Sequence, residues 1–220
     1  MVKFAGMLNV KSFTFNPFQE NTYVLYDDTK ECVIIDPGCY EKAEEQELAN
    51  FIEENGLTVK FLLNTHCHID HVLGNYFVKK KYNVDLCLHP IEEQVLKAVE
   101  TYAPNYGFNQ YSTTSGDSYL KEGEQVLFGD QALEIIFAPG HSPGHVCFYS
   151  IPDKILIGGD VLFRNSIGRT DLPGGDHDTL IESIHEKLFI LPDDVVVYCG
   201  HGPETTIGYE KETNQFCAIR

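Results

Sequence analysis

Basic residues are scarce in this sequence. Its 220 residues include 16 lysines and arginines against 33 aspartates and glutamates, which gives a net charge of −17 with histidine neutral. An excess of carboxylates repels the phosphates of nucleic acids, so we expect no nucleic-acid partner. A metal site is compatible with this charge, because a bound cation offsets the carboxylates around it.

The sequence also lacks paired cysteines and long apolar segments. Its seven cysteines form an odd set without a CxxC pair, unlike the disulfide framework of a small secreted protein. Residues 1–13, MVKFAGMLNVKSF, contain neither a sustained apolar stretch nor a small-residue cleavage pattern, and no apolar run reaches the length of a membrane span. We therefore expect a cytoplasmic protein with reduced thiols and no membrane partner.

Internal repeats, linkers and low-complexity blocks are absent as well, so residues 1–220 are predicted to form one domain of the α/β class. The oligomeric state is not indicated. The expected strands are 23–26, 32–36, 59–63, 85–88, 125–128, 133–137, 146–150, 154–157 and 195–199, and the expected helices are 41–55, 75–82, 91–102, 179–188 and 205–216. Residues 104–118 are rich in Tyr, Asn, Ser, Thr and Gly and predict a surface loop, either beside a functional site or a plain connector.

Three imidazoles and a carboxylate lie within six positions directly after the predicted strand 59–63. They are His66, His68, Asp70 and His71 in the segment THCHIDH. This spacing is too tight for one face of a helix, but a loop can arrange such side chains around two ions. Imidazole and carboxylate donors suit zinc, iron and manganese, so the donor types alone do not select the metal.

Three further donors follow or flank strand-like segments later in the chain. They are His145 in PGHSPGH, Asp160 in IGGDVLF and His201 in VVVYCGHGPETT. Glycines beside each of them permit tight turns and close approach of the backbone. Loops that follow strands collect distant residues at one point, so we expect these three to join the first four.

Together, THCHIDH, GHSPGH, GGDVLF and CGHGP resemble the metal motifs of the metallo-β-lactamase superfamily. The segments SIGRTDLPGGD at 166–176 and GHGPETTIGYEKETN at 200–214 resemble its glyoxalase II-like branch, the hydroxyacylglutathione hydrolases. The resemblance implies a four-layer αββα sandwich with the site at the edge where the two sheets meet. Full-length glyoxalase II enzymes carry a C-terminal helical region with glutathione contacts, and we expect this protein to be a relative without that region.

The resemblance also implies two zinc ions and a specific set of ligands. It implies His66, His68 and His145 on one ion, Asp70, His71 and His201 on the second, and Asp160 as a bridge between them. The segment PGHSPGH contains a second histidine, His141, and the family pattern favours His145 over it.

We hypothesise a hydrolase that cleaves a small acyl-thiol such as S-D-lactoylglutathione. Metal binding lowers the pKa of water from about 15.7 to about 7 and so supplies a hydroxide that attacks the carbonyl carbon, and Asp70 is the catalytic residue that orients it. Arg169 either contacts a substrate carboxylate or pairs with an aspartate of the protein. Cys67 and Cys199, close to proposed ligands, fit burial as small apolar residues better than a thiolate ligand or a redox sensor.

Other functions of the same fold remain open from the sequence. A persulfide dioxygenase uses a single iron held by two histidines and an aspartate, and such relatives also carry a GRTD segment. A lactonase or β-lactamase is a further enzyme of this fold. A noncatalytic protein that keeps its metal as a structural element is the alternative outside enzymology.

Overall fold

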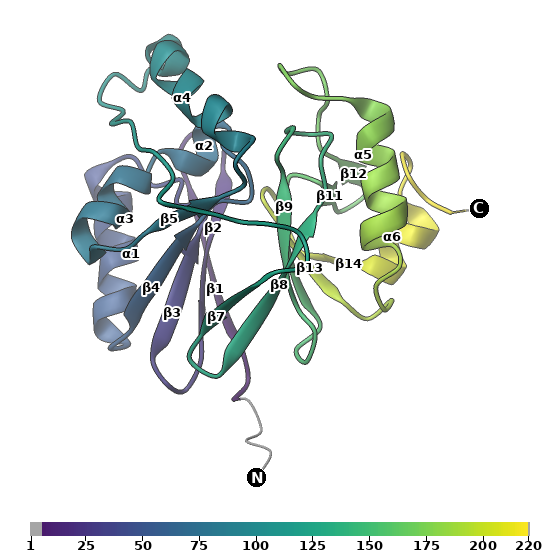
Figure 1. Ribbon diagram of the computed structural model, residues 1–220, viewed down its shortest axis with the longest axis horizontal. Coiled ribbons are helices and arrows are strands. Elements are labelled where there is room, and N and C mark those ends of the chain that lie inside the picture. Colours follow the sequence, from purple (N-terminus) through teal and green to yellow (C-terminus); the bar gives the residue numbers. More distant parts are fainter. Residues whose placement is uncertain (1–5, 220) are drawn as a thin grey trace.

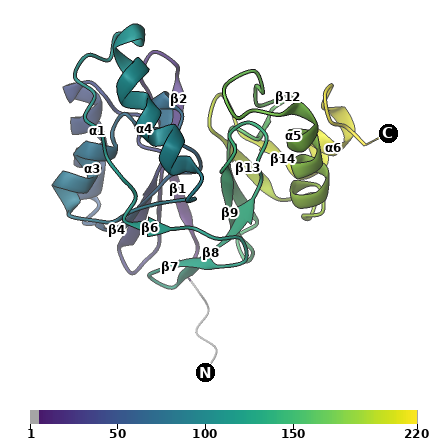
Figure 2. The same cartoon turned by 45° about the horizontal axis from the view of Figure 1, so that its top comes forward.

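Residues 6–219 of the computed structural model form two six-stranded β-sheets that pack face to face, with helices on both outer surfaces (Figure 1). This is the four-layer αββα arrangement expected for the sequence. The helices α1, α3 and α4 lie against one sheet, and α5 and α6 lie against the other, in both views (Figures 1 and 2).

The first sheet has its strands in sequence order, from β1 to β6. Its strands are β1 Asn9–Phe15, β2 Glu20–Tyr26, β3 Glu31–Ile35, β4 Thr58–Leu63, β5 Leu86–Leu88 and β6 Ser118–Tyr119. The strands β1, β2 and β3 are antiparallel hairpin neighbours, whereas β3, β4, β5 and β6 are parallel. Parallel neighbours need crossover segments, and helices provide them: α1 Lys42–Glu54, the short α2 Ile69–Val72, α3 Asn75–Tyr82 and α4 Glu92–Tyr102.

The second sheet has the order β14-β13-β10-β9-β8-β7. Its strands are β7 Gln125–Phe128, β8 Gln131–Phe137, β9 Val146–Ser150, β10 Ile155–Gly159, β13 Val196–Cys199 and β14 Thr205–Thr206. Only the β10–β13 pair among these is parallel, and α5 His177–Ser183 lies in the connection between them, continued by a helical turn at Ile184–Leu188. A small hairpin, β11 Leu162–Phe163 with β12 Ser166–Ile167, precedes α5, and α6 Ile207–Thr213 follows β14.

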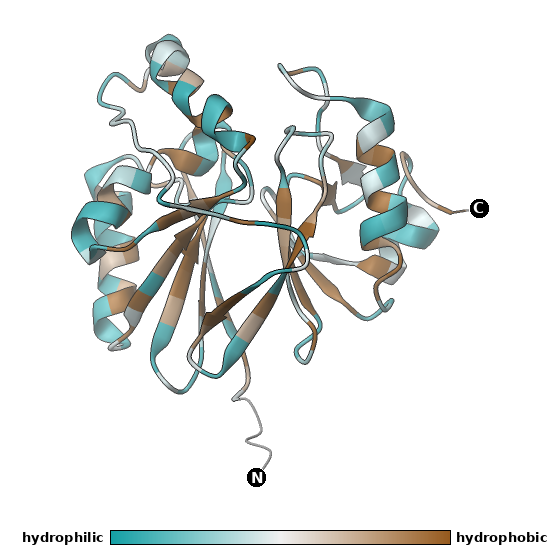
Figure 3. Cartoon of the chain, in the orientation of Figure 1, coloured by the Kyte–Doolittle hydropathy of each residue, from teal (hydrophilic) through white to brown (hydrophobic). Residues whose placement is uncertain are grey.

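The inner strands β2, β3 and β5 of the first sheet are buried on both of their faces. Ile34 and Leu62 belong to the cluster beneath the helices, while Val33 and Leu63 belong to the cluster between the sheets, which also contains Phe148 of β9. Apolar strands therefore lie between more polar outer helices (Figure 3). Full burial of such a side chain stabilises the fold by about 1.5–3 kcal/mol, so the two clusters fix the sheets against each other.

Most expected elements are present, but the short helix α2 and the hairpin of β11 and β12 were not expected, and there are further differences. The edge strand β1 and the two-residue strand β6 were not expected from the sequence. The predicted helix 205–216 begins instead as strand β14 and is helical only from Ile207 to Thr213. Within the predicted loop 104–118, a 3₁₀ turn over Ala103–Tyr106 follows α4. No helix in residues 6–219 is long and apolar enough to cross a membrane.

Candidate metal centre

Loops from both sheets meet at one edge of the sandwich. The segment after β4 lies beside the start of β9, where the Val146 N–H donates to the Thr65 carbonyl at 2.8 Å. The turn after β13 lies beside the start of β2, where the Asn21 N–H donates to the Gly200 carbonyl at 2.7 Å. These bonds between sheets bring the loop after β4 close to the loops before β9 and after β13.

Three histidines form the first donor set. His68 Nδ1 lies 2.8 Å and His66 Nε2 lies 3.3 Å from His141 Nε2, and all three side chains are buried or nearly so. A tetrahedral zinc with Zn–N bonds of about 2.0–2.1 Å places its nitrogen ligands about 3.3 Å apart. The three nitrogens are therefore spaced as ligands of one ion.

Hydrogen bonds select the nitrogen that His141 and His66 present. His141 Nδ1 lies 2.7 Å from the Arg169 carbonyl oxygen. A carbonyl oxygen can only accept a hydrogen bond, so the proton of His141 is on Nδ1 and the lone pair is on Nε2. The Thr65 hydroxyl donates to Asp36 Oδ2 at 2.6 Å and thereby accepts from His66 Nδ1 at 3.1 Å. His66 Nε2 is consequently the free nitrogen as well.

His145 lies outside this set, contrary to the sequence expectation. Its Nε2 accepts the backbone N–H of Asp160 at 3.0 Å, which occupies the lone pair that a metal would need. Its ring stacks on His66 with the centroids 4.8 Å apart. The structure thus places His141 among the donor atoms and His145 behind them.

Asp70, His71 and His201 form the second donor set, as expected. His201 Nε2 lies 3.1 Å from Asp70 Oδ2, and His71 Nε2 lies 3.7 Å from the same oxygen. The other nitrogen of each histidine is engaged: His71 Nδ1 is 3.2 Å from Asp36 Oδ2, and His201 Nδ1 is 3.1 Å from the Phe18 carbonyl. Both histidines therefore direct Nε2 toward the site.

Asp160 lies between the two sets. Its Oδ2 is 3.5 Å from His141 Nε2 and 3.6 Å from His201 Nε2, and its Oδ1 is 3.5 Å from His71 Nε2. Both Asp160 Oδ1 and His71 Nε2 are buried, and neither has a hydrogen-bond partner within residues 6–219. Such buried polar atoms are costly without a partner, so the site fits two cations that satisfy them, with Asp160 as the shared ligand.

The two sets differ in protonation. Burial, reinforced by neighbouring imidazoles, lowers the pKa of His66 well below its ordinary value and that of His68 to about 3. Burial also opposes the charged form of His71, but Asp160 and Asp70 outweigh it and raise the His71 pKa well above 6.5. The first set therefore presents neutral nitrogens, whereas a cation at the second set competes with a proton on His71.

Two buried carboxylates that the sequence analysis did not single out support the ligands. Asp36, which follows β3 with a left-handed φ of 49°, accepts from the Thr65 N–H at 2.7 Å and contacts His71. Glu92, at the start of α4, accepts from the Cys67 N–H at 2.8 Å, the Ser142 hydroxyl at 2.6 Å and the Gly144 N–H at 2.7 Å. Glu92 thus joins the loop of His66 and His68 to the loop of His141. Asp36 could have been recognised in the sequence as a carboxylate directly after a buried strand. No feature of the sequence around Glu92 indicates its role.

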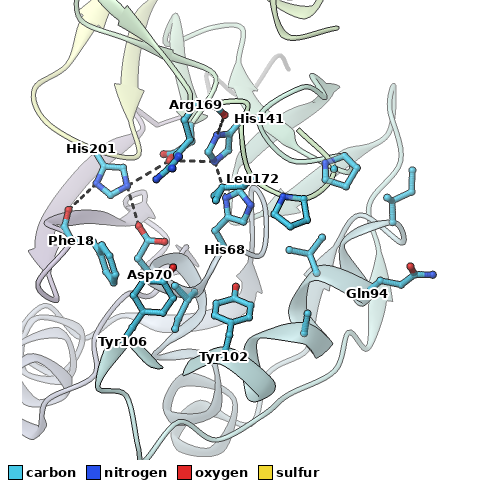
Figure 4. Close-up of a pocket in the computed structure, with 18 of the residues that line it drawn as sticks. Phe18, His68, Asp70, Gln94, Tyr102, Tyr106, His141, Arg169, Leu172 and His201 are labelled. Atoms are coloured by element: carbon cyan, nitrogen blue, oxygen red, sulfur yellow. Dashed lines mark hydrogen bonds and ion pairs between the residues drawn. The ribbon is translucent and has the colours of Figure 1, made fainter. Parts of the chain in front are cut away.

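The donors open into a pocket of about 1150 Å³. His68, Asp70, His141, Asp160 and His201 form its floor, and Tyr102, Tyr106, Leu172 and Arg169 are among the side chains around it (Figure 4). The Arg169 guanidinium forms two bonds of 2.7 Å with Asp171 and lowers the Asp171 pKa to about 2. The internal ion pair is therefore present, while Arg169 also lines the pocket.

The cysteines beside the ligands are buried thiols. Burial raises the pKa of Cys67 well above its ordinary value and that of Cys199 to about 12, and Cys67 belongs to the apolar cluster beneath the helices. All seven cysteines are buried and unpaired. This agrees with packing as their role and argues against a thiolate ligand.

Loops from both sheets of the αββα sandwich thus build a buried centre of imidazoles and carboxylates that could hold metal ions. The family model described as the metallo-beta-lactamase superfamily matches residues 15–201. The chain belongs to the metallo-β-lactamase superfamily, whose members bind divalent metals at histidine and aspartate sites.

Individual relatives place it more closely. The chain is 38% identical over 211 residues to the hydroxyacylglutathione hydrolase GloC of Haemophilus influenzae, covering 95% of this chain and 98% of GloC. It is 33% identical over 181 residues to the human mitochondrial persulfide dioxygenase ETHE1, covering 82% of this chain and 63% of that protein. The crystal structure of TTHA1623 in a di-iron-bound form superimposes with a TM-score of 0.81 at 35% identity, covering 94% of this chain and 100% of the other.

Proposed function

We propose that this protein is a metal-dependent thioester hydrolase that acts on a small acyl-thiol in the cytoplasm. The observation that carries the proposal is the pair of donor sets that share Asp160 and open into one pocket. Similarity to GloC over nearly the full length of both chains supports a thioester as the substrate.

In this proposal each of two divalent ions would be held by three side chains of its own and by one aspartate that the two ions share. His66, His68 and His141 hold the first ion, Asp70, His71 and His201 hold the second, and Asp160 holds both. When bound, such a pair of ions lowers the pKa of water, polarises a carbonyl oxygen and orients the reactants. The donors suit zinc first, and iron or manganese are alternatives that the same nitrogen and oxygen ligands accept.

The chain's own groups then position the substrate and move a proton. Asp70 lines the pocket, and its pKa is lowered because His71 and His201 outweigh the effect of its burial. An ionised Asp70 at the pocket floor orients the attacking water and accepts its proton. The apolar walls exclude bulk water, which strengthens the interactions of the reacting groups.

The persulfide dioxygenase is the second candidate, favoured by the similarity to ETHE1 and by the GRTD segment at 168–171. That reaction needs one iron held by two histidines and an aspartate. Asp70, His71 and His201 converge here as well, at distances of 3.1–3.7 Å from one another or from Asp160. A second complete set favours the two-ion hydrolase.

A substrate panel with metal analysis distinguishes the candidates. The purified protein is loaded with zinc or iron, and thiol release from S-D-lactoylglutathione, lactone opening, β-lactam opening and oxygen uptake with glutathione persulfide are measured. We expect two ions per chain and thiol release without oxygen uptake. Oxygen uptake without thioester cleavage contradicts the proposal and establishes the dioxygenase instead.

A further inference from the structure

Helix α4 has two apolar faces. Leu96 and Val99 are fully buried in the cluster beneath the helices. On another side of the helix, Ile91 at its N-terminus, Val95 and Tyr102 line the pocket, and Ile91 is 47% exposed. Val95 and Tyr102 also pack against the edge of that cluster, whereas Ile91 and Ala98 are exposed. Because one apolar stripe suffices to pack a surface helix, the apolar surface that this side still presents to the pocket is available to a ligand.

The stripe on the pocket side is long and continuous. It consists of Ile91, Val95, Ala98 and Tyr102, spaced by three or four residues as one helical face requires. At 1.5 Å per residue it extends over about 16 Å. Tyr102 and Gln94 of this helix lie on the same side of the pocket, across from His141 (Figure 4).

Apolar side chains from the other half of the molecule face into the same pocket. They come from the loop before β9, the small hairpin and the loop before α5: Pro143, Phe163, Ile167, Leu172 and Pro173. The pocket is thus a slot with apolar walls on both sides and the donor side chains at its floor. Water leaves such a slot favourably when an apolar group enters it.

Charged groups are nearly absent from the walls. Apart from the donor residues on its floor, Arg169 is the one residue charged at neutral pH among the described residues that line the pocket, and Asp171 already pairs with it. Gln94, Asn105 and Ser166 supply the neutral polar groups. A glutathione moiety carries two carboxylates and an ammonium group, and these walls offer no complete set of partners for them.

We propose that the slot along α4 binds the apolar acyl chain of the substrate, so that medium-chain acyl thioesters are preferred over hydroxyacyl ones. The inference rests on the proposed thioesterase function. The pocket, at about 1150 Å³, exceeds the usual size of a small-molecule site, about 300–1000 Å³, and a lactoyl group fills little of it. Each methylene that the slot buries raises kcat/KM by up to about fourfold.

The test is a chain-length series on one uncharged thiol. The zinc-loaded protein hydrolyses the acetyl, butyryl, hexanoyl and octanoyl thioesters of N-acetylcysteamine, with S-D-lactoylglutathione alongside, and kcat/KM is measured by thiol release. We expect kcat/KM to rise at least about tenfold from acetyl to hexanoyl. Equal values along the series, or a preference for S-D-lactoylglutathione, overturn this inference but leave the thioesterase function intact. Cleavage of none of the thioesters overturns both.

A pair of variants on α4 locates the effect. Ala98→Glu places a carboxylate in the stripe and is expected to reduce the hexanoyl-to-acetyl ratio of kcat/KM at least about fivefold. Thr101→Glu introduces the same group at an exposed position of α4 outside the pocket lining, and we expect it to preserve the ratio. An unchanged ratio in Ala98→Glu, with the wild-type chain-length dependence retained, shows that the chain binds elsewhere.

Discussion

The two halves of the molecule supply the metal centre in different ways. The first sheet contributes four donors from one loop and the short helix α2, all within six residues of sequence. The second sheet contributes His141, Asp160 and His201 from three separate loops. Donors that share one loop are recognisable as a group in the sequence, whereas donors on separate loops become a group only when their strands are packed together.

The two halves depend on each other through buried bonds. Glu92 binds backbone or hydroxyl groups of both ligand loops, and the Thr65 carbonyl accepts the Val146 N–H. Neither donor set is complete without the opposite sheet, since His141 completes the first and His201 the second. Substitutions that separate the halves are therefore expected to affect both sets.

Replacement of Asp160, the ligand that both sets share, has the largest expected effect. In Asp160→Ala both sites lose a ligand, and we expect metal content near zero and thioester turnover at least about 1000-fold lower. Metal analysis by mass spectrometry and thiol release measure the two quantities. Full metal content with full turnover contradicts the central place of Asp160.

The comparison of His141 with His145 follows. His141→Ala removes a donor from the first set, and we expect at least about a 100-fold loss of zinc affinity. His145→Gln keeps an acceptor for the Asp160 N–H, and we expect affinity within about threefold of wild type. Chelator competition measures both affinities. The reverse pattern would restore the original assignment of His145 as the ligand.

The substitution Glu92→Gln weakens the connection between the two ligand loops. It replaces one acceptor oxygen of the carboxylate by an NH₂ group, which then faces a hydrogen-bond donor. Loss of a contact that orients a metal ligand typically lowers metal affinity by about 10–100-fold. We expect a loss within that range together with a changed visible spectrum of the cobalt-substituted protein. Glu100→Gln, at an exposed position of the same helix, is the control. Wild-type affinity in Glu92→Gln contradicts a positioning role.

Acidification is expected to act on the second set first. The folded-state pKa of His71 lies well above 6.5, whereas that of His68 is about 3. Protons therefore compete with metal at His71 as the pH falls through its raised pKa, while the first set stays neutral. We expect the affinity of the second ion to drop by up to about tenfold per pH unit between pH 8 and 6. Equal pH dependence for both ions contradicts this difference.

Arg169→Ala has the smallest expected effect. Its ion pair with Asp171 lies at the surface, since the two side chains are 61% and 69% exposed to solvent. Such exposed pairs contribute little to stability. We expect an unchanged melting temperature and a KM increase confined to thioesters whose thiol part carries a carboxylate. A KM increase for uncharged thioesters shows a general role in shaping the pocket.

The pattern of the chain predicted most strands and helices because periodicity is a local property. The helix at 41–55 and the strand at 59–63 follow from apolar spacing and a terminal glycine, and α1 and β4 confirm them. The edge strand β1 and the two-residue β6 were missed. Their assignment depends on pairing with β2 and β5, which no local pattern specifies.

The sequence by itself determined the donor types and the tight group from His66 to His71, because these depend on residue chemistry and local spacing. The αββα class was expected only from the resemblance of the motifs to a known family. Tertiary structure placed His141 rather than His145 among the other donor atoms, brought Asp36 and Glu92 to the donor residues, and assembled the apolar walls of the pocket. The reason is physical: a histidine is a ligand only if its lone pair is free. For His145 that lone pair accepts the N–H of Asp160, a bond that exists only after β9 and β10 pair.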